Sequence, residues 1–207
     1  MNHWLCVFFS CSGLLVATAT AAPIQTYDVD PARTRVVISV EHAGSPRTIA
    51  IISGSEGVLR FDQNDWRNAQ LDVTVPLNRL DSGGLTVALG ARLLGDKRHP
   101  NARFVSRMIE PIDANHADVC GGLTLHGVTR PQCMSVAFNA INQRPTSSLG
   151  PIGFSATAAI SRTAFGINAW QSVIDDTVTL TINAEVVCRC RREKPGVLTA
   201  YDHSANR

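Results

Sequence analysis

The segment 119–138 constrains the fold more than any other stretch, because it predicts a β-hairpin with a fixed register. His126 and Gly127 suit a two-residue turn, since glycine reaches positive φ without steric cost. Pairing Leu125 with Val128 then decides which side chains share a face. One face carries Val119, Leu123, Leu125, Val128, Met134, Val136 and Phe138, and the other carries Cys120, Thr124, Thr129, Cys133 and Ser135. A hairpin with one apolar and one polar face must lie against further apolar structure.

Alternating apolar and polar residues elsewhere predict more half-buried strands. The clearest alternation lies in 177–186, where Val178, Leu180 and Ile182 are separated by threonines. Besides the hairpin, we predict strands at 36–41, 58–61, 71–77, 104–109, 152–160 and 177–186. Residues 44–57 hold four glycines or prolines and predict a loop followed by a short strand. Residues 86–94 are the one segment that favours a helix.

About eight strands with one apolar face each must bury those faces together. Closure into an antiparallel barrel does so and leaves no exposed edge. A two-sheet sandwich satisfies the same pattern, so the alternation by itself leaves both architectures open. At 207 residues the chain is long enough for one domain with a sizeable core.

The first 22 residues contain an apolar run and end in Thr-Ala-Thr-Ala-Ala, which is typical of a cleaved secretory signal peptide. A retained membrane anchor is the alternative, but the run falls short of the ~20 apolar residues that a span needs. We therefore expect a signal peptide (1–22), a barrel domain (23–190) and a polar tail (191–207), in a periplasmic or secreted protein without a stable membrane span. The net charge of +2 argues against nucleic acid as a partner.

Four cysteines remain after removal of the signal peptide, an even number for an oxidising compartment. Cys120 and Cys133 are directly opposite each other in the hairpin register, so a disulfide between them is the first expectation. Two free buried thiols are the alternative. Cys188 and Cys190 would then pair with each other or with another chain. Two positions along a strand place their Cα atoms roughly 6.6 Å apart, at the edge of what a disulfide accepts.

The hairpin also contains Gly122-Leu-Thr-Leu-His-Gly-Val-Thr-Arg-Pro131, which resembles the central motif of the YceI-like family of bacterial periplasmic proteins. Further segments resemble other parts of the family pattern in the same order: 27–31, 40–44, 57–62, 99–106, 152–156, 161–167 and 175–182. This resemblance implies an all-β fold, an eight-stranded antiparallel lipocalin-like barrel, here with one short helix. It also implies that the barrel interior holds a long isoprenoid or a similar lipid. The resemblance thus favours the barrel over the sandwich.

Ligand-binding residues are then expected on the inward faces of the strands and on the apolar side of the predicted helix. These residues are Val36, Ile38, Val40, Val73, Leu93, Leu94, Phe104, Val136, Phe138, Phe154, Leu180 and Ile182. For each of them, simple core packing is the alternative. Barrels of about eight strands either fill themselves or hold one ligand, so the strand number does not decide between the two.

Three further residues are candidates at the barrel mouth. His42 ends an inward stripe and is placed to meet a ligand headgroup, or else is a structural histidine. Arg162 follows a strand and would pair either with an anionic headgroup or with a local carboxylate. Trp170 would either cap the barrel or belong to its core.

Catalytic and cofactor motifs are missing from the sequence. It contains neither His-Glu-x-x-His nor Gly-x-Ser-x-Gly. The segment 90–97 imitates a phosphate-binding loop, but Asp96 stands between its glycine and its lysine and would repel phosphate. We therefore expect no enzymatic activity, no metal and no cofactor other than a bound lipid, with an apolar small molecule as the partner. The alternative is a filled barrel that acts as a structural, stress-related or protein-interaction module.

Overall fold

The computed structural model describes residues 24–42, 45–62, 65–79, 98–138, 151–169 and 175–189. These residues form ten strand segments and one short 3-10 helix, η1 (Thr163–Phe165). The strands are β1 (Gln25–Val29), β2 (Arg35–His42), β3 (Ser45–Ser53), β4 (Glu56–Asp62), β5 (Asp65–Pro76), β6 (Asn101–Pro111), β7 (His116–Leu125), β8 (Val128–Phe138), β9 (Ile152–Ser161) and β10 (Thr177–Cys188). The predicted signal peptide, the helix at 86–94 and the tail at 191–207 lie outside the described residues.

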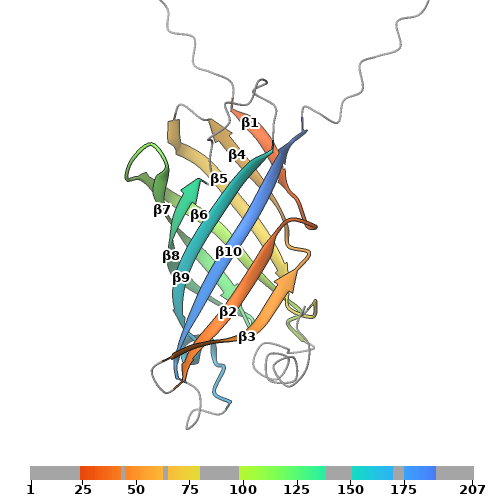
Figure 1. Cartoon of the computed structure of the whole chain (residues 1–207), viewed down its shortest axis with the longest axis vertical. Helices are drawn as coiled ribbons and strands as arrows, with labels where there is room; N and C mark the ends of the chain where they lie inside the picture. Colours follow the sequence, from red (N-terminus) through yellow and green to blue (C-terminus); the bar gives the residue numbers. More distant parts are fainter. Residues whose placement is uncertain are drawn as a thin grey trace, which may run out of the picture.

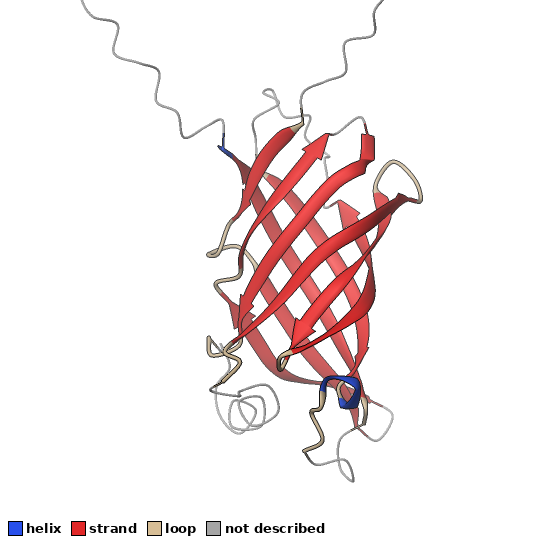
Figure 2. Ribbon diagram, turned by 180° about the vertical axis from the view of Figure 1, so that it is seen from behind, coloured by secondary structure: helices blue, strands red, loops and turns tan. Residues whose placement is uncertain are grey.

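The strands close into one antiparallel barrel (Figures 1 and 2). Pairing runs around β1-β4-β5-β6-β7-β8-β9-β10, and β10 pairs back with β1. The first half of β10 pairs with β2 and its end pairs with β1, so β1 and β2 are two parts of one interrupted strand. The same holds for β3 and β4, which pair with β2 and β1. Counted in this way the barrel has eight strands, which confirms the predicted fold class over the sandwich.

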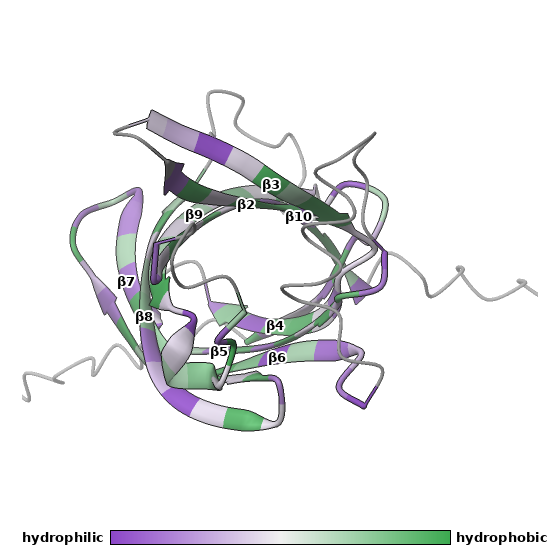
Figure 3. Ribbon diagram, turned by 90° about the horizontal axis from the view of Figure 1, so that it is seen from below, coloured by the Kyte–Doolittle hydropathy of each residue, from purple (hydrophilic) through white to green (hydrophobic). Residues whose placement is uncertain are grey.

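The buried side chains of this barrel are mostly apolar. A view along the barrel axis shows the strands as a ring (Figure 3). On β10, for example, Val178 and Val186 are buried, whereas Thr177 and Thr179 are exposed. The buried residues form two clusters, one of which gathers around β2, β3, β6 and β7. The other joins β1, β4 and the end of β10. The barrel interior is therefore the core of the protein.

The β7–β8 hairpin has the predicted register. Leu125 lies opposite Val128, and the turn between them places His126 at φ 55° and Gly127 at φ 77°. Positive φ at both central residues defines a type I′ turn, whose twist matches that of the flanking strands. The local turn chemistry thus specifies the pairing of two whole strands.

The predicted disulfide between Cys120 and Cys133 is present, with the Cα atoms 4.0 Å apart. It lies on the outward face of the hairpin, where Cys133 is exposed. Cys188 is buried and also disulfide-bonded. Cys190 lies outside the described residues.

Two strand predictions were wrong in their bounds. Residues 45–53 form the strand β3 rather than mostly a loop, because Ile49, Ala50 and Ile52 pack into the core. Pro46 is tolerated there because β3 lies at the end of the strand order, paired with β2. Strand β5 begins at Asp65, six residues before the predicted start, and so brings Trp66 into the barrel wall.

The interruptions of the first two long strands lie side by side. Asp30 accepts a hydrogen bond from the Arg33 N–H in a turn, and the Gly54 N–H donates to the Pro31 carbonyl oxygen (3.1 Å). Gly54 has φ 78°, a conformation that favours glycine. After the interruptions the chain continues into β2 and β4, and the residues that directly precede these strands, Thr34 and Ser55, are buried. We call this region the strand break, residues 30–34 and 54–55.

Candidate functional site: the barrel interior

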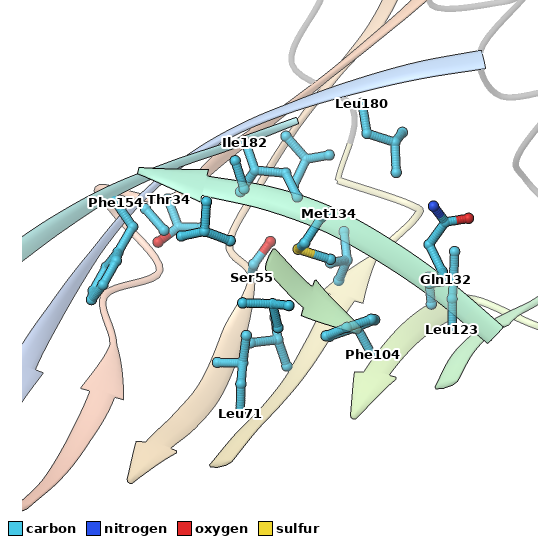
Figure 4. A pocket seen from close by; sticks show the side chains of 18 of the residues that line it. Thr34, Ser55, Leu71, Phe104, Leu123, Gln132, Met134, Phe154, Leu180 and Ile182 are labelled. Carbon is cyan, nitrogen blue, oxygen red and sulfur yellow. The ribbon is translucent and has the colours of Figure 1, made fainter. Parts of the chain in front are cut away.

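The barrel encloses a cavity of about 210 Å³. Side chains from all ten strand segments line it, and most of them are apolar (Figure 4). For scale, an apolar cavity of roughly 150 Å³ in a protein core stays dry and accommodates a benzene molecule. The interior of this barrel is therefore not filled by its own side chains.

Most of the sequence-predicted ligand residues lie around this cavity. Those that line it are Val36, Ile38, Val73, Phe104, Val136, Phe138, Phe154, Arg162, Leu180 and Ile182. Val40 is buried in the core but does not line the cavity. Leu93, Leu94 and Trp170 lie outside the described residues, as does the side chain of His42. Contact of these residues with a ligand stays a prediction.

Aromatic rings line the cavity at one end of the barrel. Phe61 and Phe138 lie near the ends of β4 and β8, and Trp66 and Phe154 lie near the starts of β5 and β9. The ring centroids of Trp66 and Phe138 are 4.1 Å apart, and those of Phe138 and Phe154 are 4.7 Å apart. We call these four residues the aromatic collar. Its rings offer a large apolar surface to a guest molecule.

Arg162 lines the cavity at its other end, where η1 packs. Its side chain is 3% exposed and donates to the backbone carbonyl oxygens of Asp175 (3.0 Å), Ile167 (3.0 Å) and Ala169 (2.6 Å). Hydrogen bonds of this kind compensate the loss of hydration of a buried charge. These donors tie Arg162 to the backbone of residues 167–169 and of Asp175, which favours the structural role of Arg162 over the capture of a headgroup.

Asp176 anchors the same segment from outside. Its carboxylate accepts hydrogen bonds from the Ser161 hydroxyl (2.6 Å) and from the Thr163 backbone N–H (2.9 Å). The bond from Ser161, followed by those from Thr163, holds the pKa of Asp176 below its ordinary value. The ionised form of Asp176 is thus the one that fits the fold.

Replacement of Asp176 by Asn is expected to make the unfolding free energy depend less on pH below about pH 4. A carboxyl group whose pKa is lowered by folding stabilises the protein above its unfolded pKa of about 3.9. That contribution is lost as the pH falls through the lower, folded pKa. Urea unfolding at pH 7 and pH 3 should show a smaller difference for D176N than for the unmodified protein. The control is D175N at the exposed neighbouring position, and parallel profiles of D176N and the unmodified protein would contradict the assignment.

Two polar residues interrupt the inward face of β8. In the described structure, backbone pairing between β8 and β9 covers only Ser135 to Phe138. Beyond them, the Gln132 side chain lines the cavity and donates to the carbonyl oxygen of Ala159 (3.1 Å). Arg130 similarly donates to the carbonyl oxygen of Ala164 (3.3 Å). Over this part of the barrel wall, side-chain hydrogen bonds from β8 therefore take the place of backbone pairing between β8 and β9.

Two buried hydroxyls differ from these satisfied groups. Thr34 and Ser55 line the cavity at 2% and 0% exposure. Within the described structure, neither side-chain oxygen has a hydrogen-bond partner. A buried hydroxyl without a partner costs roughly 1–3 kcal/mol. The sequence pattern does not single out either residue, because both fall between strands among turn-forming residues.

A closed eight-stranded antiparallel barrel with an apolar interior cavity defines the lipocalin-like class, whose members have room for one small ligand. Within this class, the family model of the YceI-like domain matches residues 27–186 of the chain. The chain therefore belongs to the YceI-like family, as its motifs predicted.

Individual relatives agree with this assignment. The chain is 36% identical over 97 residues to a UPF0312 protein of Pseudomonas putida, covering 47% of this chain and 50% of that protein. It spans about half the length of the first curated relatives that it matches. Protein YceI of Salmonella arizonae is 23% identical over 184 residues, covering 86% of this chain and 95% of that protein.

Solved structures share the fold. BcnA of Burkholderia cenocepacia aligns with a TM-score of 0.65 at 22% identity, over 76% of this chain and 98% of that one. The YCEI protein of Campylobacter jejuni aligns with a TM-score of 0.57 at 17% identity, over 85% of this chain and 91% of that one. Both comparisons support the same barrel topology.

The described ranges contain no helix with the length and apolar character needed to cross a membrane. The same residues contain no group of three or more His, Cys, Asp or Glu side chains arranged to hold a metal ion. The expected lack of metal, cofactor and enzymatic activity stays a prediction.

Proposed function

We propose that this protein holds a long apolar molecule, an isoprenoid or a similar lipid, inside its barrel and performs no chemistry on it. The cavity lined by every strand is the observation that carries this proposal. Each buried CH₂ group of a guest contributes about 0.8 kcal/mol. A few isoprene units would therefore be held firmly even after the cost of ordering the chain.

The proposal places the protein in the periplasm or outside the cell. The Cys120–Cys133 disulfide is of the kind that persists in oxidising compartments. The apolar run at 1–22 supports export as well. A filled barrel acting as an interaction module is the alternative, and the cavity counts against it.

Native mass spectrometry of the exported protein, before and after organic extraction, tests the proposal. If the protein carries a lipid, its mass before extraction should exceed that of the bare chain by the mass of one lipid, and extraction should remove this difference. Added geranylgeraniol should then bind at one molecule per chain. A bare mass in both samples, with no uptake of added geranylgeraniol, would instead favour the filled-barrel alternative.

A further inference from the structure

Thr34 and Ser55 are the unexplained polar groups of the cavity. Other polar groups near the interior have hydrogen-bond partners in the described structure. The Ser106 hydroxyl accepts a hydrogen bond from the Leu71 N–H at 2.8 Å. Gln132 donates to two backbone carbonyl oxygens. Buried polar atoms are nearly always bonded in this way, so two unbonded hydroxyls on one cavity wall need a physical reason.

The strand break explains why these two side chains face the interior. Within it, the Gly54 N–H and the Pro31 carbonyl oxygen bond to each other, so the local backbone uses its own groups. The residues that follow, Arg35 and Glu56, are exposed, and because side chains alternate along a strand, the preceding Thr34 and Ser55 face the interior. Both are therefore fixed by the backbone and cannot turn to water.

The surroundings of the two hydroxyls are apolar. The close-up shows both among side chains such as Leu71, Met134 and Ile182 (Figure 4). Of the described cavity-lining residues, the cations are Arg103 and Arg162. Arg103 is paired with Asp72 at 2.7 Å, and Arg162 donates to backbone carbonyls. A charged guest group would be poorly compensated here, whereas an uncharged oxygen would be matched.

We propose that Thr34 and Ser55 form a polar anchor inside the cavity, which binds an uncharged oxygen, a carbonyl or a hydroxyl, of an otherwise apolar guest. A hydroxyl side chain both donates and accepts, so the pair serves either group. The inference rests on the proposed function and adds to it that the guest is oxygenated and that its polar group lies within the barrel wall.

A matched set of guests tests the anchor: hexadecane, hexadecan-1-ol and hexadecan-2-one, which share a C16 chain. Each is offered to the delipidated full-length protein, and bound guest is measured by native mass spectrometry in pairwise competition. The variant T34V/S55A removes both hydroxyls at nearly constant volume. The control T157V removes an exposed hydroxyl from β9.

The preference for the oxygenated guests over hexadecane should fall roughly fivefold to tenfold in T34V/S55A, the worth of about one hydrogen bond. It should not change in T157V. Because each ratio is compared between proteins, differences in water solubility cancel. Hexadecane itself should bind T34V/S55A at least as well as the unmodified protein.

An unchanged preference in T34V/S55A, with all three guests still bound, would overturn the anchor and leave the lipid-carrier function standing. An equal loss of all three guests would show a packing role for the two residues and would also overturn it. Failure of the unmodified protein to bind any guest, geranylgeraniol included, would remove the proposed function and the anchor together.

Discussion

Replacing Ala156 with Phe is expected to abolish uptake of a long apolar guest while the barrel stays folded. Ala156 lines the cavity from β9, opposite Val136 and Ile182 on the neighbouring strands. A cavity of roughly 150 Å³ takes a whole benzene ring, so an added phenyl group would occupy most of the 210 Å³ available. If the ring displaces about four methylene groups of the guest, each worth about 0.8 kcal/mol, the affinity falls by about two orders of magnitude.

The matched control is Thr157→Phe, since Thr157 is the next residue of β9 and is exposed. Binding of geranylgeraniol should survive in T157F and be lost in A156F. Because the ring enters existing space, the unfolding free energy of A156F should change by less than the 1–3 kcal/mol typical of overpacking. Undiminished binding in a folded A156F would mean that the guest lies elsewhere.

Features of the fold that depend on only a few neighbouring residues could be predicted from the sequence. The His126-Gly127 turn specifies one register, and that register alone places Cys120 opposite Cys133. The strict alternation along β10 likewise decides which of its side chains face inward. A period of two and a tight turn act over a few residues, so they are visible in a sequence without knowledge of the rest of the fold.

Other features depend on more distant contacts. Trp66 contacts Phe138, which lies on another strand, and no local sequence pattern predicts this contact. Thr34 follows Pro31 by three residues and Ser55 follows Gly54, where a polar residue predicts a loop, yet closure of the barrel buries both. The cavity depends on side-chain volumes from every strand at once, which is why the sequence left hollow and filled barrels open.

Replacing Arg162 with Met is expected to destabilise the barrel by about 3–5 kcal/mol, because three backbone carbonyl oxygens lose hydrogen bonds from a charged donor. Methionine keeps an unbranched apolar stem but leaves the carbonyl oxygens of Ile167, Ala169 and Asp175 without their donor. Urea unfolding of R162M measures the loss. Lysine retains the charge but not the planar fork of donors, so R162K should recover only part of it.

The same variants separate the two roles that the sequence allowed for Arg162. A headgroup anchor would be revealed by loss of geranylgeranyl phosphate binding in R162M, with geranylgeraniol binding and stability unchanged. The observed geometry predicts the reverse: a large loss of stability and, in the fraction that stays folded, the same ratio of the two affinities as in the unmodified protein. Since Arg162 directs its donors to the backbone carbonyl oxygens of Ile167 and Ala169, its charge stabilises the protein and does not serve the guest.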